Sequence, residues 1–350
     1  MKTDTTMLYN IALSQLKGVG IAIAAKLLDF AEGSSEALFQ LSQKELATLS
    51  PHLKNILSEK SKREALRLAE EELKFTSKNN ITPLFFKDAE YPSRLKECKG
   101  APIVLYSKGL ANLNALRCLS VVGTRQPTQC GIDSTKAIIK EISELFPDTL
   151  IISGLAYGVD VTAHKAALYN KLPTAAVLGH GLQILYPAMH RSIAERIVNE
   201  NGALLSQYTS KSNVLPQNFI ERNAVVAGMA DATLIIESKE RGGAMATAQI
   251  ANSFSRDVLA VPGNIYEEKS KGCNKLIKSQ IAALVESAKD IGYALCWEAK
   301  GSVSQQQLLF ELSEEELQVS AILQQKGKMS LDALCSALNV PTHTLLPIIT

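Results

Sequence analysis

Five short apolar runs, each ending on glycine or glutamate, most constrain how this chain can fold. They occupy residues 119–123, 149–154, 174–179, 232–237 and 258–263. Each run is too short for a free-standing helix, and a stretch of helical character follows it. Strands that alternate with helices favour an α/β fold with a doubly wound, mostly parallel sheet, whose ligands bind outside the carboxyl ends of the strands. The residues that end the runs are therefore predicted to meet at one edge: Gly123, Gly154, Gly179, Glu237 and Gly263.

The segments around these runs predict the domain organisation. Residues 1–79 contain no convincing strand pattern and indicate a small helical domain of the sterile-alpha-motif (SAM) or helix-hairpin-helix type. The hairpin interpretation rests on Gly18 and Gly20, since turn amides in such modules contact DNA phosphates. A plain turn between two helices explains both glycines equally well. Residues 80–297 carry the strand and helix alternation, with outer strands expected at 83–86 and 102–106.

The end of the chain differs from the core in composition. Residues 298–309 are rich in Gly, Ser and Gln, which is typical of a linker. Residues 310–350 contain three short amphipathic segments with a tight turn ending at Pro341, a pattern that fits a helix-turn-helix. Because no β-wing follows the third segment, the predicted winged-helix-like domain is incomplete.

Composition narrows the class of protein. No apolar stretch approaches the roughly 18 residues of a spanning helix, and the start of the chain lacks the order of a signal peptide, so we expect a cytoplasmic protein with no membrane partner. The six cysteines form no CxxC pair, and no metal site or cofactor is predicted. The net charge is only +2, so a nucleic-acid site must come from local placement of Arg and Lys.

The loops that follow the runs suit phosphate. Glycines let backbone N–H groups approach an anion closely, and the next helix adds a favourable dipole. A dinucleotide site would need GxGxxG after the first core strand, but Gly123 is followed there by Thr124 and Arg125. No Walker sequence occurs either, so neither NAD binding nor ATP hydrolysis is predicted.

Several motifs, taken in order, resemble those of the bacterial DNA-processing protein A (DprA/Smf) family. The similarity covers roughly residues 84–297, and the order of the motifs makes chance agreement improbable although each alone is weak. The motifs are VGTR at 122–125, SGLAYGVD at 153–160, GHGL at 179–182, ERN at 221–223, GGAMATA at 242–248, VPG at 261–263 and GCNKLI at 272–277.

The resemblance implies a Rossmann-like core flanked by an N-terminal helical domain and a C-terminal winged-helix domain. It also implies a homodimer without enzymatic activity that binds single-stranded DNA and loads a RecA-type recombinase during natural transformation. One departure stands out, because Ala224 follows Arg222 and Asn223 where the family usually has a second arginine. We expect this change to weaken or shift the DNA contact.

The candidate site follows from the strand-end loops and the motifs. Arg125 follows a strand-end glycine and is placed to fork onto a phosphate, although a surface ion pair is the plainer alternative. The predicted DNA or phosphate contacts are Gly123, Thr124, Arg125, Ser153, Gly154, Ala156, Tyr157, Gly158, Arg222, Asn223, Gly242 and Gly243. Bases are expected to stack on an aromatic such as Tyr157 or Phe219.

A dimer face is predicted between residues 272 and 284. Leu276, Ile277, Ile281 and Leu284 recur there at helical spacing, and the alternative is that this stripe belongs to the core.

Other polar residues carry weaker predictions. Asp160 is expected to cap its helix, and His164 is expected to be structural more often than functional. His180 and His190 are expected at turns and on the surface. Glu237 could act as a carboxylate base, although a structural role in orienting its loop is preferred.

Two other functional classes stay open. A nucleotide hydrolase resembling the phosphoribohydrolases would need a paired Arg and Glu in the crevice. A winged-helix regulator of transcription is disfavoured because no wing is evident.

Overall fold

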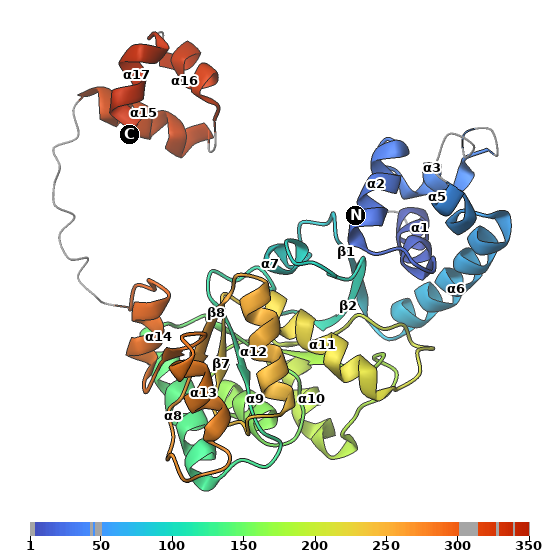
Figure 1. Cartoon of the computed structure of the whole chain (residues 1–350). Helices are drawn as coiled ribbons and strands as arrows, with labels where there is room; N and C mark the ends of the chain where they lie inside the picture. Colours follow the sequence, from blue (N-terminus) through green and yellow to red (C-terminus); the bar gives the residue numbers. More distant parts are fainter. Residues whose placement is uncertain are drawn as a thin grey trace. The chain divides into compact units, whose positions relative to one another are not determined.

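The computed structural model describes residues 4–42, 45, 51–300, 314–326, 329–338 and 340–349. The chain divides into two compact units, Met1–Lys300 and Gly301–Thr350, each of which is described here by itself (Figure 1). Most of the predicted linker at 298–309 lies outside the described residues.

The chain begins with helices, as the sequence predicts. They are α1 (Asp4–Gln15), α2 (Ile21–Phe30), α3 (Ser35–Gln40), α5 (Pro51–Ile56) and α6 (Glu59–Lys78). The hydroxyl of Ser58 caps α6 by accepting from the Ser61 N–H, and the long apolar side chains face inward, with Leu13, Leu27 and Leu57 fully buried. These helices join the same compact unit as the sheet that follows.

A nine-stranded sheet forms the centre of the first unit (Figure 1). Its strands lie in the order β1-β2-β6-β5-β4-β3-β7-β8-β9. Strands β3 to β9 run parallel, and β2 is antiparallel to both of its neighbours. The strands are β1 (Thr82–Phe85), β2 (Val104–Gly109), β3 (Cys118–Val122), β4 (Leu150–Ser153), β5 (Thr174–Leu178), β6 (Ala203–Ser206), β7 (Ala232–Ile235), β8 (Asp257–Ala260) and β9 (Ala283–Leu284). The mostly parallel sheet is confirmed, while the short strands β6 and β9 escaped the sequence analysis.

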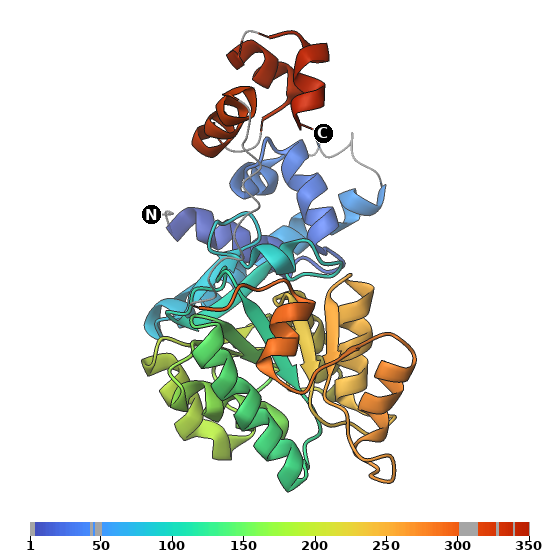
Figure 2. The ribbon, with the colours of Figure 1, turned by 90° about the vertical axis from the view of Figure 1, so that its left-hand side faces the viewer.

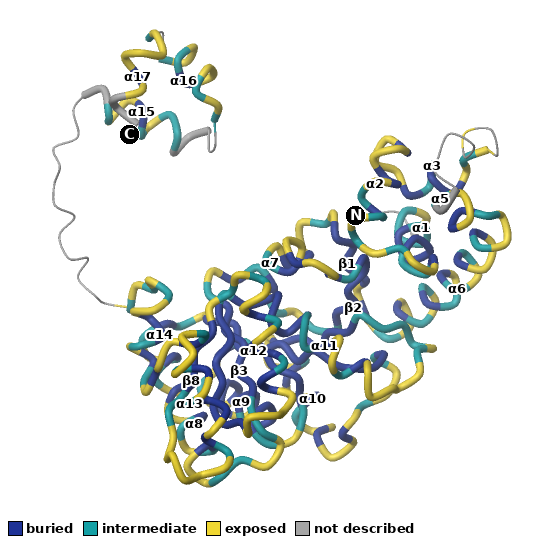
Figure 3. Tube along the Cα trace, viewed as in Figure 1, coloured by how far each residue is buried: buried dark blue, intermediate teal, exposed yellow. Residues whose placement is uncertain are grey.

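Helices cover both faces of the sheet, as Figures 1 and 2 show. Along β3, Leu119 and Val121 face one hydrophobic core, whereas Cys118 and Val122 face the other. The first face is covered by α8 (Gln129–Leu145), α9 (Val159–Tyr169) and α10 (Arg191–Asn199), and the second by α11 (Pro216–Gly228), α12 (Gly243–Ser253) and α13 (Lys271–Lys278). Figure 3 shows the strands buried between these layers.

The path of the chain creates a crevice. From β3 the chain adds β4, β5 and β6 on one side, and it then returns to place β7 on the other side of β3. Such a reversal separates the loops at the carboxyl ends of neighbouring strands, where α/β sheets bind ligands. Because all five predicted runs are parallel strands, their carboxyl ends lie at one edge, which confirms the predicted convergence.

The second unit is helical where it is described. It contains α15 (Glu314–Lys326), α16 (Leu331–Leu338) and α17 (Thr342–Ile349), which share a small core of Val319, Leu334 and Leu345. The assignment of this unit to a winged-helix domain stays a prediction. Within the described parts of the chain, no helix combines the length and the apolar character needed to cross a membrane.

A cationic pocket at the carboxyl edge of the sheet

A pocket of about 740 Å³ opens where β3 and β7 end. Its walls come from the loop after β3, the start of α11 and the loop between β7 and α12. Eight of the predicted contact residues line it: Gly123, Thr124, Arg125, Ala156, Arg222, Asn223, Gly242 and Gly243. The crevice predicted from the strand order is thus a real cavity in this fold.

Neighbouring loops fix the backbone of Thr124. Its N–H donates to the Glu237 carbonyl at 2.8 Å, and its carbonyl accepts from the Val159 N–H at 3.2 Å. Gly158 has a positive φ of 78°, and a Cβ there would lie 2.3 Å from the Thr124 oxygen. Only glycine tolerates both the positive φ and the lack of room for a Cβ atom. Gly158 packs against the loop that lines the pocket and does not line the pocket itself.

Glu237 holds the same loop through its side chain. The buried carboxylate accepts from the Thr128 N–H at 2.8 Å and from the Thr128 hydroxyl, which also caps α8. A Cβ on Gly131 would lie 2.5 Å from the carboxyl carbon, so the group is tightly enclosed. These contacts confirm the structural role and leave the carboxylate poorly placed to act as a base.

Arg222 reaches under the pocket from α11. It is 4% exposed, and its Nη1 donates to the carbonyls of Gly154 and Val177, at the ends of β4 and β5. A Cβ at Gly154 would lie 2.1 Å from Nη1, which explains the glycine and its place beneath the pocket wall. Burial lowers the pKa of Arg222, and the nearby Asp160 opposes this effect. Among the described residues, no carboxylate lies within ion-pair distance of this guanidinium.

Two predicted roles near this arginine need correction. Helix α9 begins at Val159 with Gly158 as its N-cap, so Asp160 does not cap it. The Asp160 carboxylate instead accepts from the Gly154 N–H at 3.2 Å, and burial raises its pKa. Ser153 is fully buried and donates to the Val121 carbonyl at 2.6 Å, so its hydroxyl joins two strands rather than facing the pocket.

Exposed cations form the rim of the pocket. Arg125, Lys239 and Arg241 all line it, and none makes an ion pair with a carboxylate in the described part of the chain. Glu240, which lies between two of them, is 3.9 Å from Lys275 instead. Helix α12 begins at the same place, with Gly242 as its N-cap, and it directs free N–H groups and the positive end of its dipole to the rim. Lys239 and Arg241 escaped prediction, although they precede Gly242 in one loop.

The opposite wall is apolar. Phe219 packs against Gly179, where a Cβ would lie 2.8 Å from the ring, and it meets Tyr186 edge-on at 5.8 Å between centroids. Leu215 and Ile220 continue this wall and are each 52% exposed. Tyr157, the other predicted stacking residue, lies outside the lining and packs on His190. The lining therefore combines cations from the loops after β3 and β7 with aromatic and aliphatic groups mainly from the start of α11.

The histidines near the sheet are structural. His164 is fully buried, its Nδ1 lies 2.7 Å from the Thr174 hydroxyl, and burial lowers its pKa to about 3. The expected surface positions of His180 and His190 are wrong, because both rings are buried and bond to backbone groups of nearby loops.

Fewer residues of the predicted dimer face are exposed than their helical spacing suggested. Leu276 is 2% exposed and belongs to the core, so its assignment to a partner-facing surface is corrected. Ile277 and Ile281 are half-buried against the same core, and Leu284 on the edge strand β9 is 48% exposed.

Comparisons with known proteins agree with this fold. The family model described as DNA recombination-mediator protein A matches residues 82–295. The DNA processing protein DprA of Streptococcus pneumoniae is 37% identical over 201 residues, which are 57% of this chain and 70% of that protein. The curated relatives are matched over 48% to 70% of their own length.

Solved structures give the same result. The structure of DNA processing protein A from Streptococcus pneumoniae has a TM-score of 0.67 at 29% identity and covers 83% of this chain and 98% of that chain. The Helicobacter pylori protein, studied for its single-stranded DNA binding mode, has a TM-score of 0.55 at 24% identity over 62% of this chain and 95% of that chain. The family match extends over every strand of the sheet and over the pocket, and the chain belongs to the DNA recombination-mediator protein A family.

Proposed function

We propose that this chain binds single-stranded DNA across the carboxyl edge of its sheet and acts as a recombination mediator in natural transformation. The observation that carries the proposal is the mixed lining of the pocket, which combines exposed cations without ion pairs and an apolar, aromatic part. Nucleic-acid sites without sequence preference combine a positive groove for the backbone with aromatic platforms for the bases. Membership of the mediator family supports the same role.

Each side of the pocket suits one part of a nucleotide. Phosphates would meet Arg125, Lys239 and Arg241 and the N–H groups at the start of α12, while bases would lie against Phe219. Arg222 also lines the pocket and would add positive charge there, partly offset by the nearby Asp160. Ala224 itself does not line the pocket, and the expected weakening or shift of DNA binding by the missing second arginine stays a prediction.

A nucleotide hydrolase is not favoured. Such an enzyme needs a carboxylate free to activate water or substrate. Asp160, which lines the pocket, and the buried Glu237 beneath the loop after β3 both accept hydrogen bonds from backbone N–H groups. We therefore propose that the protein binds single-stranded DNA without cleaving it and uses no metal or cofactor.

The remaining parts of the proposal concern partners. A cytoplasmic homodimer would meet through the edge near β9, with Leu284 exposed and Ile277 and Ile281 beside it. Such a dimer would present two pockets and deliver the bound strand to a RecA-type recombinase. The domain boundaries predicted at residues 79 and 297 also stay a proposal.

Replacement of Arg125 by Ala tests the pocket. Binding of oligothymidylate should weaken, and the slope of log K against log salt should lose about 0.7, the value for one phosphate contact on a single strand. Stability should change by no more than about 0.5 kcal/mol, because this arginine is exposed and unpaired. Arg63→Ala, on the exposed face of α6, is the matched control and should bind normally. Unchanged affinity and slope for Arg125→Ala in a folded protein would place the strand elsewhere.

A further inference from the structure

One loop supplies part of the apolar wall of the pocket. Residues 207–215 connect β6 to α11, and the loop ends at Val214 and Leu215, which line the pocket. The position of this loop therefore sets where Val214 and Leu215 stand in the wall, beside Phe219 on α11.

The turn of this loop is bound by the N-terminal helices. Glu72 on α6 accepts from the Ser210 N–H at 2.9 and 3.0 Å with its two oxygens, and the Ser210 hydroxyl donates to the same carboxylate. One residue on, the Lys211 ammonium pairs with Glu71. These contacts join residues that are 138 and 140 positions apart in the sequence.

The two ends of the loop are tied to the core separately. The Tyr208 hydroxyl donates to the Asn218 carbonyl at 3.1 Å, and the Asn218 side chain donates to the Asn213 carbonyl at 2.9 Å. Thr209 packs against Gly181, where a Cβ would lie 2.3 Å from the Thr209 oxygen. The carboxylate of Glu72 completes this set by binding the turn between the two ends.

Burial makes the Glu72 contact specific. Glu72 is 4% exposed, and a carboxylate taken out of water is costly unless donors satisfy it. Burial raises its pKa, and the hydrogen bonds from Ser210 oppose that change. A displaced loop would leave this carboxylate without its donors, so the position of the turn is strongly defined.

We propose that α6 positions the apolar wall of the pocket, with Glu72 acting through Ser210 as a positioning residue for single-stranded DNA. The inference rests on the proposed function. The N-terminal helices would then contribute to DNA affinity without touching the strand.

The variant Glu72→Gln tests this arrangement because it keeps the shape and removes the charge. We expect affinity for oligothymidylate to fall by up to about 3-fold to 10-fold, the limit reached if the bound position of the loop loses the full worth of one charge-assisted hydrogen bond. Hydrogen exchange should accelerate in residues 207–215 while the sheet stays protected. Glu70→Gln, on an exposed position of the same helix, is the matched control and should change neither readout.

The outcomes separate the two proposals. Normal affinity for Glu72→Gln together with weak binding by Arg125→Ala would overturn the positioning role and leave the DNA pocket intact. Faster exchange in the loop without any loss of affinity would also overturn it and reduce Glu72 to a structural residue. Normal binding by both variants would overturn the proposed function itself. If Glu72→Gln unfolds α6, Ser210→Ala is a milder test from the half-buried loop, because it removes the hydroxyl bond to Glu72 and keeps the two N–H bonds. A smaller loss of affinity is expected there, and normal affinity would count against the proposal.

Discussion

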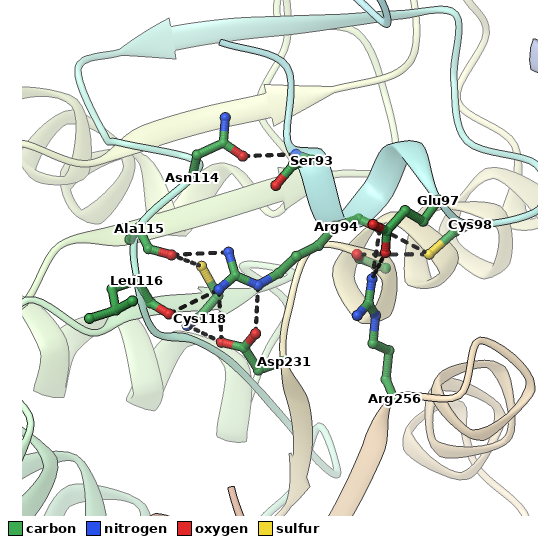
Figure 4. Close-up of polar contacts among 11 residues, drawn as sticks. Ser93, Arg94, Glu97, Cys98, Asn114, Ala115, Leu116, Cys118, Asp231 and Arg256 are labelled. Atoms are coloured by element: carbon green, nitrogen blue, oxygen red, sulfur yellow. Dashed lines mark hydrogen bonds and ion pairs between the residues drawn. The ribbon is translucent and has the colours of Figure 1, made fainter. Parts of the chain in front are cut away.

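Arg94 and Arg222 lie at opposite edges of one sheet, and they differ in what neutralises them. Arg94 follows β1 on the short helix α7 (Ser93–Lys96) and binds both oxygens of Asp231, at 2.6 and 3.2 Å, near the amino ends of β3 and β7. Its remaining donors reach the carbonyls of Ala115 and Leu116 at 3.0 Å, and Asp231 also accepts from the Cys118 N–H (Figure 4). Burial alone would lower the pKa of Arg94, but the bond to Asp231 and nearby charges raise it.

Arg222 has no such partner. It donates to two carbonyls, burial lowers its pKa, and its Nε has no hydrogen-bond partner in the described structure. The amino edge thus contains a satisfied ion pair that fastens the segment before β3 to the sheet. The carboxyl edge contains a buried charge that makes no ion pair and has only the nearby buried Asp160 as a compensating charge. The burial of an arginine therefore does not show whether it has a structural role or belongs to a ligand site. The groups that accept its hydrogen bonds distinguish the two roles.

The largest expected effect concerns the ion pair between Arg94 and Asp231, which we call the clamp. Asp231→Ala leaves the largely buried Arg94 without its carboxylate and should lower the free energy of unfolding by about 3 kcal/mol. Affinity for oligothymidylate in the folded protein should stay normal, because the pocket lies at the other edge. Urea unfolding and a binding titration measure the two quantities, and reduced affinity in folded protein would contradict the separation of the edges.

Arg222→Met should show the reverse pattern. The variant loses hydrogen bonds worth about 1 kcal/mol each and the compensating charge beside Asp160, but it no longer buries a guanidinium, so the net loss of stability should stay below about 2 kcal/mol. Oligothymidylate binding should weaken about tenfold, which corresponds to one charge-assisted contact. A stability loss as large as that of Asp231→Ala, with unchanged affinity, would make Arg222 a second clamp.

The smallest effect is expected at the start of α12. A Cβ on Gly243 meets no atom within 4 Å, so Gly243→Ala should leave stability unchanged or raise it by up to about 0.5 kcal/mol. The added methyl group would stand where a phosphate approaches the helix N-terminus, and affinity should fall about 3-fold, or roughly 0.7 kcal/mol. Gly20→Ala, equally open and outside the pocket, is the control. Equal affinity for both variants would show that the strand does not reach this helix end.

Sequence alone predicted the parts of the site that depend on strand ends. The apolar run before Gly123 identified β3, and the parallel order then placed Thr124 and Arg125 at the crevice. Spacing gives the position of a residue but not the direction of its side chain. Ser153 and Leu276 were therefore assigned to surfaces, although the structure buries both.

The apolar wall was less accessible to prediction. Val214 and Leu215 stand in a loop without periodicity, and their position depends on Glu72, far away in the sequence. Strand β9 has only two residues, too few to be distinguished from a loop. Strand β6 is as long as β4 and β7, so its length does not explain why the sequence analysis missed it. These features arise from contacts between distant segments, which no local pattern records.

The two outer strands of the sheet are unequal, and this limits how copies of the chain could join. At one end, α1 and α6 pack against β1, and Pro83 lacks the N–H group that a further strand would need. At the other end, both residues of β9 are exposed. If two copies met through β9, both exposed edge strands would be paired. Each outer end of the joined sheet would then be the β1 edge, which helices cover. Assembly through this sheet would therefore terminate at a pair instead of growing into a fibre.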